Sequence, residues 1–442
     1  MLTLSSTAMR RRSRRSLTAA LSTLAAAFAT AALGAEAGLS LEAAVQMATQ
    51  RSSLIPAAEL QAQAAREMAV AAGQRPDPVL KAGINNLPID GADRFTLTRD
   101  FMTMRAVGVM QEITRPSKLG ARSARYEREA DAAQAARTLA LTSLRRDAAM
   151  AWLDRHFQER MREQLLAQRA EAALQIEAAD AAYRGGKGAQ GDALAARAAV
   201  ALIDDRLRQN ERQIATAITR LARWVGPEAN GALAAPPDLR STRLGTAGIE
   251  TDLAHHPEIA MLAAQEEVAR AEAGIAQSNK RADWSVELML SQRGPAYSNM
   301  VSLTVSIPLQ IDAGQRQDRD VAARLALAEQ MRARREDAMR EHRAETSAWL
   351  QEWQGNRERL AHYDETLLPL AAERTRAALT AYRGGTGALA AVLEARRSEI
   401  ELRMDRLRLE METAGRWAQL EYLLPPVHEA PARTTSPMEP RP

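Results

Sequence analysis

An eight-residue segment occurs twice in the chain, so any fold must accommodate two copies of one unit. The sequence AYRGGKGA covers residues 182–189, and AYRGGTGA covers residues 381–388, at an offset of 199 residues. A second correspondence lies upstream. There the helix-like residues 60–74 and 266–280 run into RPD and RAD respectively, and then into strand-like sequence. The two offsets, 199 and 206 residues, are similar, and such self-similarity indicates a duplication.

Each copy has the same expected order of elements: a helix, two strands, a very long helix, a glycine-rich turn and a returning helix. In the first copy, residues 38–226, we expect these elements at about 40–74, 78–87, 102–113, 118–183, 184–188 and 189–225. In the second copy, residues 251–424, we expect them at about 251–281, 283–292, 299–309, 314–383, 383–387 and 388–423. Residues 227–250 form the expected linker, and the Pro-rich residues 425–442 an expected disordered tail.

The composition agrees with a fold that is mainly α with a small β part. Aromatic residues make up only 4% of the 442 residues, whereas hydrophobic residues make up 46% and charged residues 26%. That balance is typical of long helices packed side by side. A continuous helix over 118–183 would be roughly 100 Å long, so it forms a coiled coil or spans a wide space. The absence of cysteine excludes disulfides, thiolate metal sites and a cysteine nucleophile.

The first 37 residues have the pattern of an export signal. Five arginines between residues 10 and 15 precede an apolar stretch from Leu17 to Leu33, and Ala35-Glu36-Ala37 supplies the small-x-small pattern before a cleavage point. An uncleaved membrane anchor is the alternative, but the stretch is short and no stop-transfer pattern follows it. Removing this segment takes the formal charge from +4 to zero, so a basic surface for nucleic acid is not indicated.

The second pair of expected strands is apolar on one face and polar on the other. Residues 284–291 and 300–309 alternate Trp, Val, Leu or Ile with Ser, Thr, Glu or Met. This pattern suits a membrane β-barrel with a wet lumen, or a half-buried sheet in a soluble domain. Four strands cannot close a barrel, and lipid tolerates no open sheet edge. Membrane strands would therefore have to come from several chains, and three chains would supply twelve.

The export signal, the duplicated unit and the paired Tyr-x-x-Gly turns together resemble the TolC family of outer-membrane efflux proteins. The resemblance covers residues 39–424 and includes the opening segment LSLEAA from Leu39 to Ala44. It implies a homotrimer with a twelve-stranded barrel in outer-membrane lipid, continued by a periplasmic α-helical barrel. It also implies a passive conduit rather than an enzyme, without a cofactor. The implied partners are a periplasmic adaptor and an inner-membrane RND pump.

Three short segments are more similar to the heavy-metal branch of this family, which comprises cobalt–zinc–cadmium and copper–silver efflux: NNLP at 85–88, DFMTM at 100–104 and VMQE at 109–112. We therefore expect heavy-metal cations or drugs as the cargo. The thioethers of Met102, Met104 and Met110 would suit Cu(I). Methionine also fills irregular packing on strands, and we assign no metal site to these residues. The lack of a lipidated cysteine argues against the copper–silver branch.

Glycines in both turns allow two long helices to reverse within a few residues: Gly185, Gly186 and Gly188 in the first turn, and Gly384, Gly385 and Gly387 in the second. We expect positive φ at Gly185 and Gly384. A plain helix hairpin is one interpretation, whereas the resemblance implies that both turns form the periplasmic tip. A phosphate-binding loop is excluded, because Gly188 follows Lys187 and no strand precedes the turn.

The resemblance also implies a tunnel gate near the tip. The tip motif aligns Asp192 with the acid and Tyr382 with the tyrosine of the family's closing hydrogen-bond network, and Glu394 with an acid of the entrance constriction. Gly387 stands where the family usually has a basic partner, so the closed state is held more weakly or by other contacts. Asp192 could instead be only a first-turn acid of a helix.

Two features have structural interpretations. The adjacent histidines of His255-His256-Pro257 point to different helix faces, and no acid–histidine spacing follows them, so we predict an exposed helix start rather than a metal site. Pro369 lies inside the second long helix, where it should remove one backbone hydrogen bond and bend the helix.

Two other classes of function remain open on the residues alone. A periplasmic adaptor also has long helices and a tip turn. Adaptors normally have one hairpin flanked by β-rich segments, whereas this chain has two hairpins and few β residues. A cytosolic coiled-coil scaffold would have neither the export signal nor the amphipathic strands. We therefore favour the efflux channel.

Overall fold

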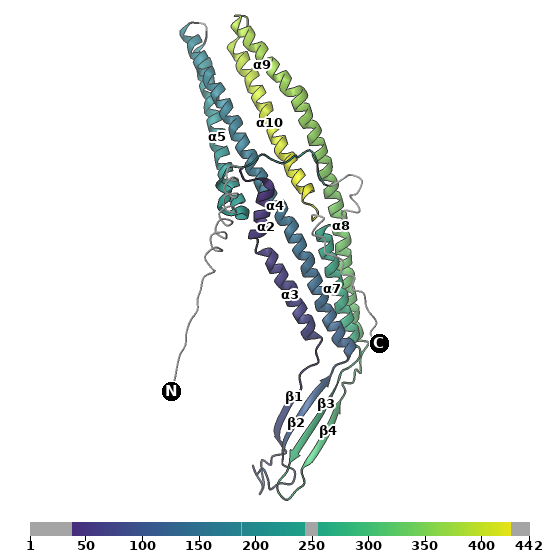
Figure 1. The fold of residues 1–442 in the computed structure, drawn as a ribbon. Coiled ribbons are helices and arrows are strands. Elements are labelled where there is room, and N and C mark those ends of the chain that lie inside the picture. The colour runs from purple at the N-terminus through teal and green to yellow at the C-terminus, as the bar shows by residue number, and fades with distance from the viewer. Residues whose placement is uncertain (1–37, 187, 244–254, 426–442) are drawn as a thin grey trace, which may run out of the picture. The chain divides into compact units, whose positions relative to one another are not determined.

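Figure 1 shows the computed structural model of the chain, which describes residues 38–186, 188–243 and 255–425. The expected export signal, part of the linker, Lys187 and nearly all of the expected tail lie outside the described residues.

The described chain forms two compact units. The first contains the residues up to 47 together with residues 151–238, and the second contains residues 48–150 together with those from 239 onward. The fold is mainly helical, with one small antiparallel sheet that belongs to the second unit. The longest helix, α4 (Pro116–Arg184), has 69 residues and contributes to both units.

In the first unit, α4 leads into α5 (Gln190–Val225) and the short 3-10 helix η1 (Gly226–Asn230), and α2 (Leu41–Arg51) begins here. Buried small and branched side chains recur along one side of α5: Ala193, Ala196, Leu207, Ala217, Leu221 and Val225. The helix ends where Gly226 adopts a φ of 77°, a left-handed conformation that favours glycine.

Buried polar side chains of α4 bind two backbone segments of the first unit, one at Leu39 and one at residues 229–231. The indole nitrogen of the fully buried Trp152 donates a hydrogen bond to the Leu39 carbonyl at 2.8 Å. The buried Arg155 donates to the carbonyls of Ala229 and Gly231 and forms an ion pair with Glu159 at 2.8 Å. These bonds satisfy buried donors that would otherwise be costly.

The second unit contains the remaining helices: α3 (Leu54–Ala72), α7 (Pro257–Asn279), α8 (Gln317–His362), α9 (Leu368–Arg383) and α10 (Leu389–Glu421). Helix α7 packs against α8, and α10 packs against α8 and α9. A tryptophan again reaches a loop carbonyl, because Trp353 donates to Leu239 at 3.3 Å. Each half of the chain thus has a tryptophan on a long helix that donates a hydrogen bond to a backbone carbonyl, Trp152 to Leu39 and Trp353 to Leu239.

The second long helix is interrupted near Pro369. Between α8 and α9 lies a π-helical segment, η2 (Tyr363–Leu367), in which the Leu368 N–H donates to the Tyr363 carbonyl, five residues back. Pro369 lacks the N–H that would continue the regular pattern, so the hydrogen-bond ladder shifts by one residue there. The expected continuous helix over 314–383 is therefore divided at the proline.

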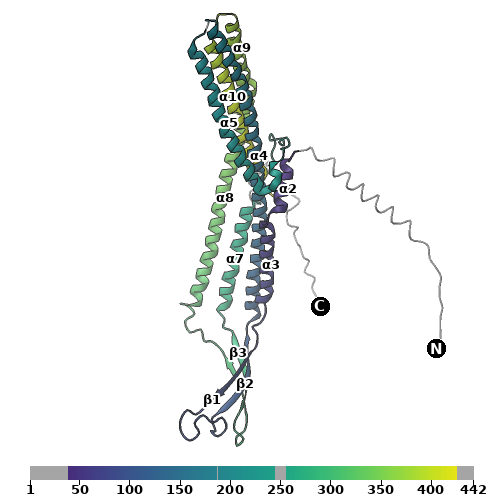
Figure 2. The same cartoon turned by 90° about the vertical axis from the view of Figure 1, so that its left-hand side faces the viewer.

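The four strands form one sheet in the order β1 (Val79–Asn85), β2 (Met104–Ile113), β3 (Trp284–Gln292) and β4 (Met300–Ser306), with all neighbours antiparallel. Each strand lies within one of the four expected ranges. The β2–β3 pairing joins the two copies of the duplicated unit. Each strand also follows or precedes one helix directly, so α3, α4, α7 and α8 lead into the sheet (Figures 1 and 2).

Candidate functional site

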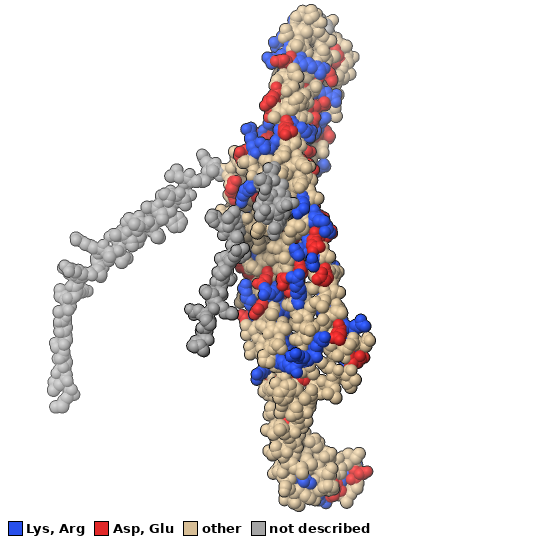
Figure 3. All heavy atoms as spheres, turned by 90° about the vertical axis from the view of Figure 1, so that its right-hand side faces the viewer, with Lys and Arg blue, Asp and Glu red and all other residues tan. Residues whose placement is uncertain are grey.

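The sheet presents a continuous apolar face to its surroundings. The pairing register places Leu80, Val109, Leu288 and Leu303 in one row across the four strands. Leu80 is 71% exposed and Leu303 is 69% exposed, and the neighbouring rows on this face also expose Val and Leu. Charged side chains are concentrated on the helices and are rare over the strands (Figure 3). A patch of this kind requires a covering by lipid or by a partner.

The opposite face of the sheet is polar. Ser302 pairs with Met289, and Thr304 pairs with Glu287. On this face the Lys81 ammonium lies 2.5 Å from the Glu287 carboxylate, although β2 lies between their strands. The lysine crosses β2 at Gly108, which has no side chain, and a Cβ there would lie 2.6 Å from the Leu288 carbonyl oxygen. Gly108 therefore permits both the close strand approach and the ion pair.

Four methionines share this polar face: Met104, Met110, Met289 and Met300. Met102 precedes β2 and is exposed. The Met102 N–H donates to the Asp100 carboxylate at 2.8 Å, which positions its backbone in a turn. The methionines singled out in the sequence thus occupy two different environments.

The sheet is open at both edges. In the part of the chain that the structure describes, β1 pairs only with β2, and β4 pairs only with β3. Unpaired edge N–H and C=O groups cannot be left facing hydrocarbon, because each unsatisfied group costs several kcal/mol there. In hydrocarbon, a sheet that is open at both edges would therefore need further strands.

A shielded ion pair marks the junction between sheet and helices. The Lys118 ammonium at the start of α4 lies 2.6 Å from the Asp283 carboxylate just before β3, and both side chains are largely buried. Asp283 also accepts a hydrogen bond from the Arg115 N–H at 3.4 Å. The sequence singled out Asp283, because this residue ends the repeated RAD motif. It did not indicate the partner Lys118, which is 165 residues away.

The glycines within each helix reversal differ in backbone conformation. Positive φ occurs at Gly186 (69°) and Gly385 (76°), not at Gly185 and Gly384, so the expectation for the first glycine of each turn was wrong. Gly384 caps α9 in a right-handed helical conformation, and the left-handed residue follows one position later. The first glycine still continues the helix, and only the second has to reverse it.

The second reversal is a complete Schellman motif. The Thr386 N–H donates to the Ala381 carbonyl at 3.0 Å, and the Gly385 N–H donates to the Tyr382 carbonyl at 3.0 Å. A Cβ on Gly387 would lie 3.0 Å from the Ala381 Cβ, and one on Gly188 would lie 3.0 Å from the Ala182 Cβ. The third glycine of each turn is thus required by close packing against the preceding helix.

The expected gate residues lie near these reversals. Asp192 is in the first turn of α5, and its carboxylate accepts the Ala189 N–H at 3.3 Å, which caps the helix. Tyr382 is half-buried in the last turn of α9, and Glu394 is exposed on α10. Asp192 belongs to the first unit and the other two to the second, so an Asp192–Tyr382 bond stays a prediction.

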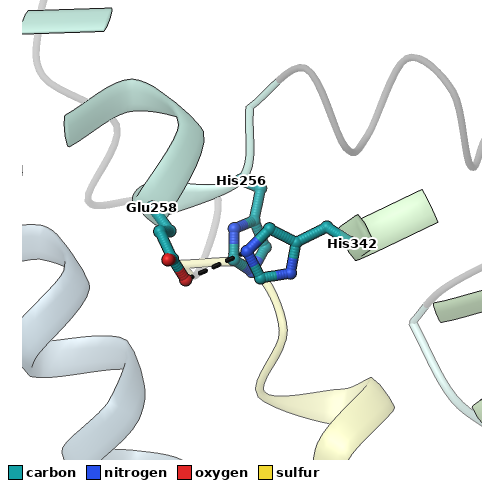
Figure 4. A group of neighbouring side chains, drawn as sticks. All are labelled: His256, Glu258 and His342. Carbon is teal, nitrogen blue, oxygen red and sulfur yellow. Dashed lines mark hydrogen bonds and ion pairs between the residues drawn. The ribbon is translucent and has the colours of Figure 1, made fainter. Parts of the chain in front are cut away.

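The structure brings together one polar cluster that the sequence did not indicate. His256, Glu258 and His342 lie close together at the start of α7 and on α8 (Figure 4). Burial lowers the pKa of His256 to about 4, with His342 and Arg146 contributing repulsion. The predicted exposed helix start was wrong for His256, which is 7% exposed at the N-cap of α7. His342 follows Glu258 by 84 residues, so no local spacing could have revealed the group.

Among the helices that the structure describes, none combines the length and the apolar character needed to cross a membrane.

Comparison with known proteins now defines the class. Residues 248–424 match the family model of the outer membrane efflux protein. No curated protein matches the chain in sequence. The fold of the outer membrane protein VceC from Vibrio cholerae matches with a TM-score of 0.70 and 18% identity, covering 87% of this chain and 95% of that chain.

Two further solved structures have similar folds. The channel protein CusC matches with a TM-score of 0.73 and 15% identity, covering 87% of this chain and 92% of that chain. The open state of the MtrE outer membrane channel of Neisseria gonorrhoeae matches with a TM-score of 0.69 and 16% identity, covering 88% and 89%. These close TM-scores do not select a branch, so the heavy-metal cargo stays a prediction.

The resemblance to the TolC family of outer-membrane efflux proteins is confirmed. The family model identifies the class over residues 248–424, and the solved structures establish the fold over both copies. The family match over residues 248–424, together with the channel fold over both copies, supports an outer-membrane efflux channel subunit, a passive conduit rather than an enzyme, and does not favour the adaptor alternative.

Proposed function

We propose that three copies of this chain assemble into one duct that carries cargo from the periplasm through the outer membrane. The observation that carries this proposal is the open four-stranded sheet with one exposed apolar face and one polar face. Such a sheet suits lipid on one side and water on the other only if its two edges are paired.

Strand direction favours a ring of copies. In an antiparallel sheet of four strands, β1 and β4 run in opposite directions, so β4 of one copy can pair with β1 of the next without breaking the alternation. Such head-to-tail contacts form a closed ring when the rotation closes. Two copies would give eight strands, whose interior is filled by side chains. Three copies give twelve strands and, as the family resemblance implies, a lumen wide enough for passage.

The polar face would then line the lumen. Ser302, Thr304 and the Lys81–Glu287 ion pair would face water, and the row containing Leu288 and Leu303 would face lipid. The methionines on the polar face would also line the path. Their thioethers are compatible with soft heavy-metal cargo. A neutral, weakly polar lining is also compatible with drugs.

The helix reversals serve as the periplasmic tip in this proposal. They would meet a periplasmic adaptor, which links the duct to an inner-membrane RND pump. Asp192 and Tyr382 would hold the entrance closed by a charge-assisted hydrogen bond, and Glu394 would add a ring of carboxylates that favours cations. The cargo would be chosen mainly by the pump, with heavy-metal cations as our first candidates.

Cysteine crosslinking tests the ring directly, because the chain has no cysteine of its own. Cysteines at Leu80 on β1 and Leu303 on β4, joined by a flexible bifunctional maleimide, should give covalent dimers and trimers. Cysteines at Val107 and Leu290, which pair within one chain, are the matched control and should give only monomers. Crosslinking of the β1–β4 variant that stays within one chain would contradict the proposed ring.

A further inference from the structure

Two helices of the second unit bring three metal-ligating side chains to one place. His256 is the N-cap of α7, Glu258 lies in the first turn of α7, and His342 lies on α8. Their ligand atoms all lie within 4.8 Å of one another. The Nε2 of His342 is 2.9 Å from a Glu258 carboxylate oxygen, and the centres of the two imidazole rings are 4.2 Å apart (Figure 4).

The cluster contains polar atoms without partners. Nδ1 of His256 is buried and has no hydrogen-bond partner among the described residues, whereas Nδ1 of His342, also without a hydrogen bond, has the Glu345 carboxylate 3.7 Å away. His256 as a whole is more than nine-tenths buried. Buried polar side-chain atoms in native proteins nearly always have a partner, so an unpaired imidazole nitrogen beside another imidazole and a carboxylate points to a missing ligand.

We propose that His256, Glu258 and His342 bind a divalent transition metal ion of the Zn²⁺ class. Two imidazoles and one carboxylate suit Zn²⁺, Cu²⁺, Ni²⁺ or Co²⁺, whereas Mg²⁺ and Ca²⁺ prefer all-oxygen sites. Bonds of about 2.0–2.2 Å in a tetrahedral site separate the ligand atoms by roughly 3.3–3.6 Å. The ligand atoms of the cluster lie 2.9 Å to 4.8 Å from one another, so side-chain movements of about 1 Å would complete the site.

The surroundings of the cluster favour a bound cation. The carboxylate of Glu345 lies 3.7 Å from Nδ1 of His342, where it can orient the ring with Nε2 toward the metal. The nearby cation Arg146 is paired with Asp147 at 2.9 Å, which offsets its repulsion of a bound ion.

A metal at this place would join the start of α7 to the body of α8. It lies on the helices and uses none of the residues of the sheet or the helix reversals. The proposal therefore does not depend on what the channel carries, and its test does not measure transport.

The test titrates metal-stripped protein in detergent with Zn²⁺ against a fluorescent zinc chelator. Wild type should bind one Zn²⁺ per chain. Glu258→Gln and His342→Gln should each lower the Zn²⁺ affinity at least about tenfold. His362→Gln removes an exposed histidine elsewhere on α8 and is the matched control, expected to leave binding unchanged. Co²⁺ should give intense visible absorption bands in wild type, and Glu258→Gln should lose them.

Two outcomes would overturn the proposal. Equal Zn²⁺ binding by wild type and His342→Gln would show that the cluster is held by hydrogen bonds alone. Weakening by His362→Gln as large as by Glu258→Gln would show binding at unspecific surface groups. Glu258 is partly exposed, so its substitution decides the question even if a His256 variant fails to fold. Zn²⁺ should also raise the unfolding temperature of wild type but not of His342→Gln.

Discussion

Arginine substitutions on adjacent residues of β4 should have unequal consequences for assembly. Leu303 lies in the central row of the apolar face, opposite Leu288, whereas Ser302 points to the polar face opposite Met289. Arg on the lipid face of a barrel costs roughly 2–4 kcal/mol near the bilayer midplane, and little on the lumen side. Because the proposed trimer holds three copies, Leu303→Arg should cost about 6–12 kcal/mol per assembly.

The assay is refolding into lipid vesicles, with the assembled fraction measured by heat-modifiable gel mobility over a urea series. Leu303→Arg should lose most assembly in conditions where Ser302→Arg retains it. Leu303→Phe keeps an apolar side chain and serves as the control, with assembly close to wild type. Equal effects of the two arginines would show that β4 is not a membrane strand. The reverse order would show that the lipid and lumen faces are exchanged.

The other predictions concern the helix reversals and the gate. Gly385→Val should abolish efflux with the barrel intact, because a β-branched residue at a φ of 76° is strained, whereas Gly384→Ala should be tolerated since that residue is right-handed. Full efflux by Gly385→Val would remove the tip geometry from the mechanism. Asp192→Ala or Tyr382→Phe should each raise single-channel conductance in planar bilayers. A charge-assisted bond contributes about 1.5–3 kcal/mol, and the double variant should add little to either single one. Unchanged conductance in both would mean that other contacts close the tunnel.

Periodicity and repetition made the strands and the reversals predictable. Alternation over residues 300–309 identified the two faces, because a strand places successive side chains on opposite sides. The repeated AYRGG segment located both reversals, since few residues besides glycine allow two helices to turn so sharply. It could not show which glycine is left-handed, because that depends on where the last helical hydrogen bond forms. In the structure Gly384 still belongs to the helix end, and Gly385 makes the reversal.

Contacts between distant segments could not be predicted. The Lys81–Glu287 pair depends on the register of three strands and on the missing side chain of Gly108. The position of His342 beside His256 depends on how α7 packs along α8, a relation that no local pattern encodes. The sequence pattern shows only that His255 and His256 are adjacent, whereas the imidazole that lies beside His256 belongs to His342 on α8.

The number of chains in the detergent-solubilised protein tests the central claim most directly. The open sheet edges and the opposite directions of β1 and β4 predict a closed ring, and the family resemblance implies three chains in it. Native mass spectrometry of the full-length protein purified from outer membranes should therefore give a single species of three chains that persists on dilution. A stable monomer or dimer under the same conditions would contradict the account, because four or eight strands of this sheet could not enclose an open duct.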